Sequence, residues 1–414
     1  MNIRVPLGLL VSAVLLLAPA GCRHAVRGGE PTVSILITGP VEPGLLPRAA
    51  ALAEGRREQG ELVWLVAGPV GLETQSGRVT EGWGILRLLE LAGADALVFG
   101  PDWLELGVEE VNRLVGSADL QLLSCNLVDS LGEPLAHRML ILRLAAATVG
   151  FTSVWTDTAD PRLALAGVNL LAPDRAAART LGMLKMHCDL VGLVPRPDAG
   201  DRSLAAGYDF TIGPVDVPTV SAAVPEDPGR AWRLELRLAG GSVSDFRVVE
   251  ERLADWPEQP MVRQAVESLQ AVVDSVLAVP VAGGLTSAGS EALSRQLQDA
   301  VLGDGFDGFL TDRPLFDRVP GPGGVDAGAV LAAMPEPGRL AIVELTGWVI
   351  AELTGEDGVD LRWGQAFSRR PLVMTQRYRL VATSGFLARH PLAALNGYQL
   401  ASEPAWRVAL GVLR

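Results

Sequence analysis

The chain contains few of the residues that bind transition metals or act as nucleophiles. Its 414 residues include four histidines, His24, His137, His187 and His390, and three cysteines. These histidines are too few and too scattered to build an imidazole-rich site for two metal ions. His187 is better explained as a core or surface residue than as a ligand. The spacings G-x-S-x-G, G-x-x-x-x-G-K, C-x-x-C and H-E-x-x-H are also absent, so no common catalytic signature supports an enzyme.

Positive charge is scarce as well. Lys185 is the only lysine, and 35 basic residues stand against 48 acidic ones, which gives a formal net charge of −13. A surface this acidic repels the phosphate backbone of nucleic acids, so we expect no nucleic-acid partner. The composition, 49% hydrophobic and 20% charged, is typical of a globular protein. The length corresponds to two or three domains.

After residue 22 the chain lacks apolar runs long enough to cross a membrane. Leu7 to Ala20 is an apolar run with the length of a signal-peptide core. It ends in Pro19-Ala20-Gly21-Cys22, which is similar to the bacterial lipobox, where cleavage precedes a cysteine that becomes lipidated. Pro19 stands where the usual pattern has leucine. An ordinary cleaved signal peptide with an incidental Cys22 is the alternative.

We therefore expect a lipoprotein signal peptide over residues 1–22 and a tether over residues 23–30. The protein would be exported and anchored to the membrane through a lipid on Cys22, on the periplasmic side of the bacterial cell envelope. Arg23 stands where an aspartate would resemble the signal for inner-membrane retention, so the outer membrane is preferred.

Two cysteines remain in this oxidising compartment, Cys125 and Cys188. Each lies at the edge of an apolar run, and nothing in the sequence places them within bridging distance. Two buried free thiols, each behaving as a small hydrophobic side chain, are therefore favoured over a disulfide.

Short apolar runs alternate with amphipathic stretches through the first part of the chain, which predicts alternating strands and helices. Strands are expected at 33–37, 62–67, 96–99 and 120–125, and helices at 46–58, 82–92 and 108–115. Because these strands are apolar throughout, they are buried on both faces, which indicates a layered α/β domain.

The pattern changes further along the chain. Residues 232–238 alternate apolar and charged side chains, as a half-exposed antiparallel strand does. Pro257–Pro260 indicates a linker, and residues 262–276 repeat apolar side chains at helical spacing. A second α/β region follows.

Four stretches carry motifs in a distinctive order. Gly93–Gly100 contains G-x-D-A-x-x-x-G, and Leu122–Leu127 reads L-L-S-C-N-L. Leu340–Gly347 reads L-A-I-V-E-L-T-G, and Tyr378–Ala388 reads Y-R-L-V-A-T-S-G-F-L-A. In order and spacing these motifs resemble those of the secreted 5′-nucleotidases and UDP-sugar hydrolases. The likeness extends, with gaps, over residues 31 to 400.

The resemblance implies a four-layer α/β metallophosphoesterase-like sandwich, followed by a smaller α/β domain that binds the nucleoside in this family. It predicts a metallophosphoesterase-like domain over 31–256, a linker and connecting helix over 257–276, and a 5′-nucleotidase C-terminal-like domain over 277–414. In the family the first domain holds two divalent metals, which polarise the phosphoryl group and generate a hydroxide.

The family's metal-binding motifs, T-N-D-x-H, D-A-G-D, G-N-H-E, S-H and G-G-H-S-H, can each be aligned with this chain. At the ligand positions the chain has Pro40, Glu42, Pro69, Pro101, Asp102, Arg196, Val215 and Val217. Three of these are prolines, which offer no side-chain donor atom. The alignment therefore predicts a degenerate metallophosphoesterase site with no catalytic residue, no bound metal and no cofactor.

A remnant metal site made of carboxylates is the alternative for this domain. On the alignment, Glu42, Asp102, Glu105 and Asp216 would surround the old site, and Ca²⁺ or Mg²⁺ takes such oxygen ligands. Exposed acidic loop residues are the simpler explanation for a chain this acidic.

The second domain also departs from the family. The arginine of the family's N-G-G-G-I-R loop aligns with Asp317, a reversal of charge that would repel the same anionic ligand. Phe386 and Tyr398 are candidates for stacking on a flat ligand, with core packing as the favoured role.

We therefore predict a catalytically inactive 5′-nucleotidase-like lipoprotein that acts as a binding or structural module in the cell envelope. One alternative is a divergent metal-dependent phosphoester hydrolase acting on nucleotides. Another is a small-molecule receptor that uses the cleft between the domains, near Phe386 and Tyr398. The sequence identifies no protein partner.

Overall fold

The fold was analysed in a computed structural model. The structure describes residues 31–413 except 41, 71–73, 159, 161–162, 164–165, 197–203, 214–219, 282–289, 304, 317–324, 335–337, 357–358, 365–370 and 395–397. The predicted signal peptide, the tether and Cys22 lie outside these residues. In the described part, no helix combines the length and the apolar character needed to span a bilayer.

A six-stranded sheet forms the centre of the N-terminal domain, in the order β13-β12-β1-β2-β3-β4. Strands β1 to β4 run parallel, and β12 and β13 are antiparallel additions at one edge. The strands are β1 (Thr32–Thr38), β2 (Leu62–Val66), β3 (Ala96–Val98), β4 (Gln121–Leu123), β12 (Arg230–Ala239) and β13 (Ser242–Arg252).

A second sheet packs on the first, in the order β11-β10-β9-β7-β6. Its strands are β6 (Leu140–Arg143), β7 (Thr148–Trp155), β9 (Leu190–Arg196), β10 (Phe210–Ile212) and β11 (Val220–Ala222), and a small ribbon pairs β5 (Leu127–Val128) with β8 (Asn169–Leu170). Side chains alternate along β1, which explains why the second sheet packs on one face of the first sheet and helices pack on the other. Ile35 and Ile37 pack between the two sheets with Phe151 and Val194, whereas Leu36 points into the helical layer.

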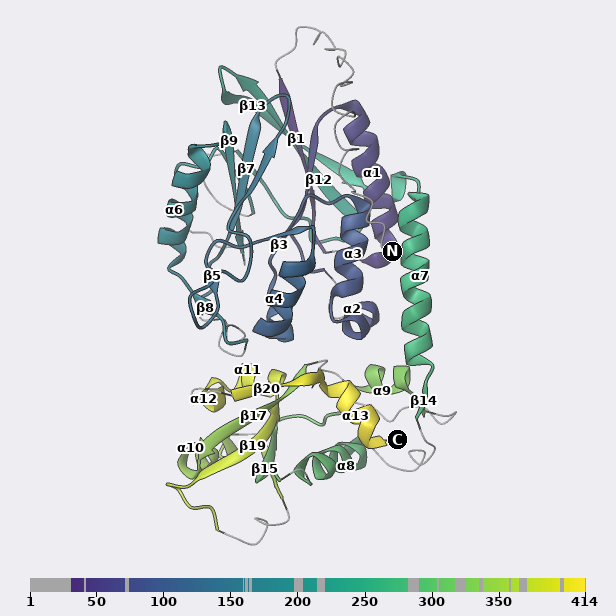
Figure 1. Cartoon of the computed structure of the whole chain (residues 1–414), viewed down its shortest axis with the longest axis vertical. Coiled ribbons are helices and arrows are strands. Elements are labelled where there is room, and N and C mark those ends of the chain that lie inside the picture. Colours follow the sequence, from purple (N-terminus) through teal and green to yellow (C-terminus); the bar gives the residue numbers. More distant parts are fainter. Residues whose placement is uncertain are drawn as a thin grey trace, which may run out of the picture.

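Helices cover both outer faces, which gives four layers (Figure 1). They are α1 (Leu46–Gln59), α2 (Gln75–Thr80), α3 (Trp83–Ala92), α4 (Val108–Ser117) and α6 (Pro173–Lys185), with 3-10 turns η1 (Pro43–Leu45), η2 (Pro101–Leu106) and η3 (Leu253–Asp255). Helix α6 packs on the second sheet, and α1 and α3 pack on the first. The layered α/β fold class is therefore confirmed.

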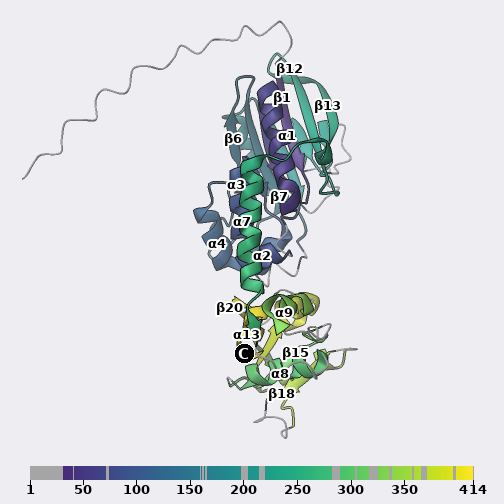
Figure 2. The same cartoon turned by 90° about the vertical axis from the view of Figure 1, so that its right-hand side faces the viewer.

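Helix α7 (Pro260–Leu277) runs along the N-terminal domain and reaches the second domain (Figure 2). Pro260 starts it, and the Gln259 side chain caps it by accepting a hydrogen bond from the Val262 N–H at 2.7 Å. Its N-terminal half packs on α1 and α3, and its C-terminal residues Val273 and Leu277 enter the core of the second domain.

The second domain contains a mixed sheet in the order β18-β15-β19-β17-β20. Its strands are β14 (Pro280–Val281), β15 (Gly308–Thr311), β16 (Val325–Asp326), β17 (Arg339–Thr346), β18 (Asp360–Trp363), β19 (Arg377–Thr383) and β20 (Tyr398–Pro404). Helices α8 (Ser290–Leu302), α9 (Ala327–Ala333) and α13 (Ala405–Leu413) contribute to one apolar core, and α10 (Gly347–Thr354), α11 (Ser384–Arg389) and α12 (Pro391–Ala394) contribute to another.

The elements predicted from apolar periodicity are confirmed to within a few residues. The predicted helix 262–276 is α7, and the predicted half-exposed strand 232–238 lies inside β12. Cys125 and Cys188 are both free thiols, Cys125 buried and Cys188 partly exposed. Burial raises the pKa of the Cys125 thiol, which keeps it protonated and unreactive.

Four aspartates link the amino ends of neighbouring strands through hydrogen bonds to the backbone. Asp95, Asp189, Asp209 and Asp307 each directly precede a strand. Their carboxylates accept hydrogen bonds from a backbone N–H of the next strand in the sheet, with N···O distances of 2.7 to 2.8 Å. The sequence signal for this contact is an aspartate directly before an apolar run.

We expect Asp209→Ala to lower the free energy of unfolding by about 1–3 kcal/mol, because the N–H of buried Val191 loses its carboxylate partner. Urea denaturation measures the change. Asp245→Ala is the matched control, since Asp245 makes only an exposed pair with Arg237, and a change below about 0.5 kcal/mol is expected for it. Equal effects of the two substitutions would contradict the role assigned to Asp209.

Candidate functional site

The predicted metal-site positions lie where the topology should bring them together. Strands β1, β2 and β3 are parallel neighbours, with Thr38 beside Val66 and Val66 beside Leu97. Pro40, Pro69 and Pro101 therefore follow three adjacent strands at one carboxyl edge. Parallel α/β sheets place their ligand sites at this edge.

Glu42 and Asp102 lie in the same segments as Pro40 and Pro101, after β1 and β3. The other predicted positions belong to the second sheet or fall outside the described residues. Arg196 ends β9 and pairs with Trp155 of β7. Val215 and Val217 are outside the described residues, and so is Asp216.

Backbone segments pack tightly at the ends of β1 and β2. A Cβ atom on Gly39 would lie 1.7 Å from the Pro225 carbonyl oxygen, and one on Gly68 would lie 2.4 Å from the Pro40 nitrogen. The hollow beside Pro40 and Glu42 has a volume of ≈ 10 Å³, about the space that one water molecule needs. The segments that follow β1 and β2 thus leave little room between them.

Two tryptophans fill the layer beneath this edge. Trp64 of β2 is fully buried, and its Nε1–H donates to the Thr38 hydroxyl at 3.1 Å. Trp103, in the turn η2 that follows β3, is also fully buried, with its ring centroid 6.4 Å from that of Phe99. On the alignment Trp103 stands at the last position of the family's G-N-H-E turn, so a packing side chain has replaced a polar one.

These residues do not fit a two-metal centre. Among the described residues, no group of three or more His, Cys, Asp or Glu side chains is arranged to hold a metal ion. Pro40 and Pro69 supply no ligand atom, and the side chain of Glu42 is exposed. The side chains of Asp102 and Glu105 lie outside the described part of the structure, so the carboxylate remnant stays a prediction.

Three residues of the motifs that resemble the 5′-nucleotidase family stabilise the fold. They are Asp95, Asn126 and Gly347. Asp95, from the G-x-D-A motif, accepts hydrogen bonds from the Trp64 N–H and the Arg57 guanidinium. Asn126 is fully buried and holds Trp155 at both its N–H and its carbonyl, at 2.8 and 2.7 Å. A Cβ on Gly347 would lie 2.2 Å from the Val373 carbonyl oxygen, so this position requires glycine.

The described histidines do not lie together, because His137 adjoins the carboxyl end of β4, His187 follows α6 and His390 follows α11. His187 is exposed, in agreement with the interpretation as a surface residue. The backbone of His137 bridges to Leu123. His390 lies in the second domain, where its Nε2 is 3.1 Å from Asp312 Oδ2 and its Nδ1 is 2.9 Å from Glu356 Oε2.

The two aromatic residues considered for ligand stacking are engaged in other contacts. Phe386 has no exposed surface, and its ring centroid lies 4.4 Å from that of His390. Tyr398 packs beside the core of the second domain. Burial raises the pKa of its phenol, and a hydrogen bond from the backbone of Gly167 in the first domain opposes this shift. Phe386 is thus enclosed in the second domain, and Tyr398 is partly buried at its boundary with the first domain.

Asp312 is the centre of a charged cluster in the second domain. Its two carboxylate oxygens each lie 2.6 Å from the Arg389 guanidinium, and His390 approaches as described. Burial acts to raise the pKa of Asp312, but the hydrogen bonds from Arg389 and His390 outweigh it and hold the pKa below its ordinary value.

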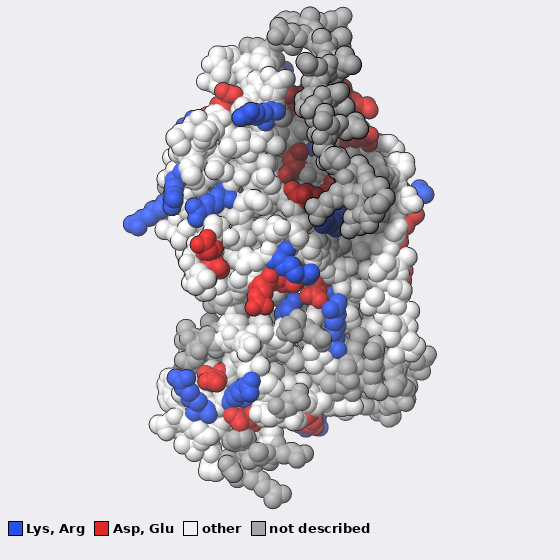
Figure 3. All heavy atoms as spheres, in the orientation of Figure 1, with Lys and Arg blue, Asp and Glu red and all other residues white. Residues whose placement is uncertain are grey.

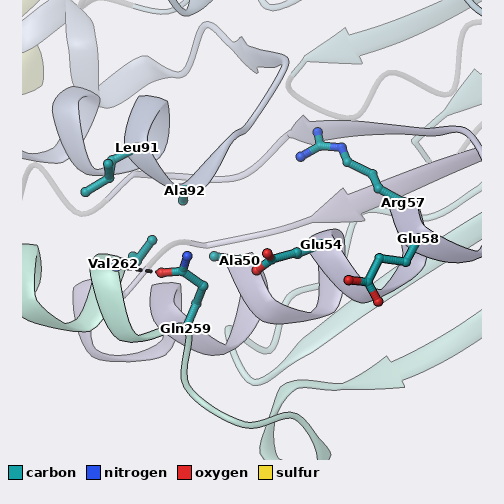
Figure 4. Close-up of a pocket in the computed structure, with 8 residues that line it drawn as sticks. All are labelled: Ala50, Glu54, Arg57, Glu58, Leu91, Ala92, Gln259 and Val262. Atoms are coloured by element: carbon teal, nitrogen blue, oxygen red, sulfur yellow. Dashed lines mark hydrogen bonds between the residues drawn. The ribbon is translucent and has the colours of Figure 1, made fainter.

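A larger hollow lies elsewhere, among α1, α3 and α7 (Figure 4). Its volume is ≈ 450 Å³, and Glu54, Glu58, Leu91 and Gln259 are among its lining residues. It lies near the ends of α1 and α3, which precede β2 and β3, and so at the amino edge of the sheet. It is therefore remote from the predicted metal-site positions.

On the face shown in Figure 3, basic and acidic side chains are intermixed.

Several solved structures share this fold. One is a 5′-nucleotidase precursor from Thermus thermophilus, with TM-score 0.57, 14% identity and coverage of 92% of this chain and 96% of that chain. Another is a putative 5′-nucleotidase from Staphylococcus aureus in complex with α-ketoglutarate, with TM-score 0.61, 10% identity and coverage of 92% and 96%. A third is the sulfate thiohydrolase SoxB from Thermus thermophilus, with TM-score 0.53, 20% identity and coverage of 91% and 80%.

These likenesses cover most of the chain and establish that it has the two-domain fold of the 5′-nucleotidases. No model of a known protein family matches the chain, and no curated protein matches its sequence. A shared fold at this level of identity leaves the chemistry open, because function depends on the site rather than on the frame.

We expect Gly39→Ala to lower the free energy of unfolding by about 1–3 kcal/mol, because the added methyl group would overlap the Pro225 carbonyl oxygen. Gly44→Ala is the matched control, since nothing lies within 4 Å of its added Cβ. Thermal or urea unfolding compares the two variants. Similar stability of both would contradict the close packing at the end of β1.

The Asp312 cluster predicts a dependence of stability on pH. Because folding lowers the pKa of Asp312, its contribution is present above the unfolded-state pKa of about 3.9 and is lost as the pH falls through the folded-state pKa. Asp312→Asn should therefore destabilise the protein more at pH 7 than at pH 3. Asp299→Asn, which removes a more exposed pair with Arg362, should show a small effect at both pH values. An Asp312→Asn effect independent of pH would contradict the assignment.

Proposed function

We propose that this chain, which has the fold of the 5′-nucleotidases, is a catalytically inactive member of that structural class. It would serve as a binding or structural module in the bacterial cell envelope, exported and anchored through a lipid on Cys22. The observation that carries the proposal is the carboxyl edge of β1, β2 and β3. Prolines follow the first two strands there, and the backbone segments beside them are in contact.

The chemistry of a two-metal phosphoesterase explains why this edge matters. Such an enzyme must hold two cations with carboxylate and imidazole ligands before a hydroxide can form at neutral pH. Asp95, Asp189, Asp209 and Asp307 do not serve this purpose, because their carboxylates accept hydrogen bonds from backbone N–H groups at the amino ends of the strands. In this proposal the fold is kept while the residues at its metal-ligand positions are replaced.

A divergent hydrolase is the competing function, and the fold itself is what favours it. It would have to use the carboxylates of Glu42, Asp102, Glu105 and Asp216 in place of the family's ligands. The two proposals differ in metal content and in turnover, which are measured independently.

We expect the purified full chain to carry less than stoichiometric metal by elemental analysis. We also expect no hydrolysis of nucleotides or UDP-sugars above background after addition of Mn²⁺, Zn²⁺ or Ca²⁺. The reason is that the carboxyl edge of β1, β2 and β3 has closely packed backbone and few ligand atoms. No metal ion would be held there to activate water. A solved 5′-nucleotidase of the same fold, assayed in parallel, is the positive control.

One result would overturn this proposal in favour of the hydrolase: stoichiometric metal together with turnover that Asp102→Ala abolishes. Glu291→Ala is the matched control for that substitution, since Glu291 lies in the second domain and makes only an exposed pair with Arg295. Loss of turnover in both variants would indicate contamination or general damage instead of a site at Asp102.

A further inference from the structure

The two domains are joined by one carboxylate bonded to two arginines. Glu81 follows α2 in the first domain. Its Oε2 lies 2.9 Å from Arg339 Nη2 at the start of β17, and its Oε1 lies 2.9 Å from Arg407 Nη1 in α13. Both arginines belong to the second domain. We call these three residues the Glu81 clasp.

Additional hydrogen bonds fix the orientation of each guanidinium. Arg407 also donates from Nη2 to the Val79 carbonyl in the first domain, at 3.1 Å. Arg339 donates from Nη1 to the Ala401 carbonyl in β20, at 3.1 Å. The side chains of Arg339 and Glu81 are only 10% and 17% exposed, so solvent screens their interaction less than that of a surface pair.

The backbone at Glu81 is unusual in a way that serves this contact. Among the described residues, Glu81 is the only one other than glycine with a positive φ, at 51°. This left-handed conformation is disfavoured for residues with a Cβ atom. It ends α2, with the Gly82 N–H bonded to the Gly77 carbonyl. A glycine would satisfy this conformation better, so the glutamate has to be explained by its side chain.

Apolar side chains surround the clasp. Val79 of α2 is 7% exposed and packs within the core of the second domain, together with Val273 and Leu277 of α7 and with Trp406. A carboxylate between two guanidinium groups adds direction to this contact, because charge-assisted hydrogen bonds constrain the angle as well as the distance. Apolar packing alone would leave the two domains freer to slide.

We propose that the Glu81 clasp locks the two domains in a single relative orientation, so that the chain behaves as one rigid body. The two domains then cannot rotate relative to each other about the α7 junction. This inference does not depend on the proposed function, since either an inactive module or a hydrolase could have locked domains.

Electron-spin distance measurements test the lock. Spin labels are placed on cysteines introduced at Glu109 of α4 and Glu291 of α8, both exposed. The measurement uses the full chain with its three native cysteines replaced by serine. The intact clasp should give a single narrow distance distribution. Glu81→Ala should give a broad distribution or a second peak, because the two arginines lose their shared partner.

Three further variants, Glu81→Gln, Arg339→Met and Glu267→Ala, make the result decisive. Glu81→Gln keeps the shape but removes the charge, and it serves as the test if Glu81→Ala fails to fold by circular dichroism. Glu267→Ala removes an exposed pair with Arg263 on α7 and should leave the narrow peak unchanged. The proposal is overturned if the intact protein already shows two populations. It is equally overturned if the narrow peak persists in Glu81→Gln and in Arg339→Met.

Discussion

Parallel strands deliver their carboxyl ends to one edge of a sheet, and this constraint governs the first domain. The segments after β1, β2 and β3 must meet, whatever residues they contain. In this chain Gly39 and Gly68 permit direct backbone contact there, and prolines follow each. Among the described residues at this edge, main chain packs closely and two tryptophans lie buried nearby.

Four aspartates share one structural role in the two domains. Asp95, Asp189, Asp209 and Asp307 lie at the amino edges of their strands, and each carboxylate accepts a backbone N–H from the neighbouring strand. These four carboxylates therefore stabilise the pairing of adjacent strands. Such a role depends on one N–H group at short range, so it does not require any ligand at the opposite edge of the sheet.

The sequence predicts the layered fold and the helix α7 well because both rest on local periodicity. The resemblance aligns Pro40, Pro69 and Pro101 with ligand positions of the family, but their common location after three adjacent parallel strands is seen only in the structure. Contacts between distant residues were not predictable in this way. Glu81 and Arg339 are 258 residues apart, and nothing in the pattern around Val79 indicates that it packs in the core of the second domain. Only the tertiary structure brings such pairs together.

Residues that stabilise the fold and residues that would bind a metal differ in how much stability is lost when they are replaced. Asn126 bonds to backbone groups of two other segments in a fully buried setting, so its loss would leave several polar groups unsatisfied. A ligand at the end of a strand contacts a cation and solvent, and its replacement by proline leaves no such deficit. Mutation can therefore remove a metal ligand at little cost to stability, whereas the loss of a residue such as Asn126 would weaken the fold itself.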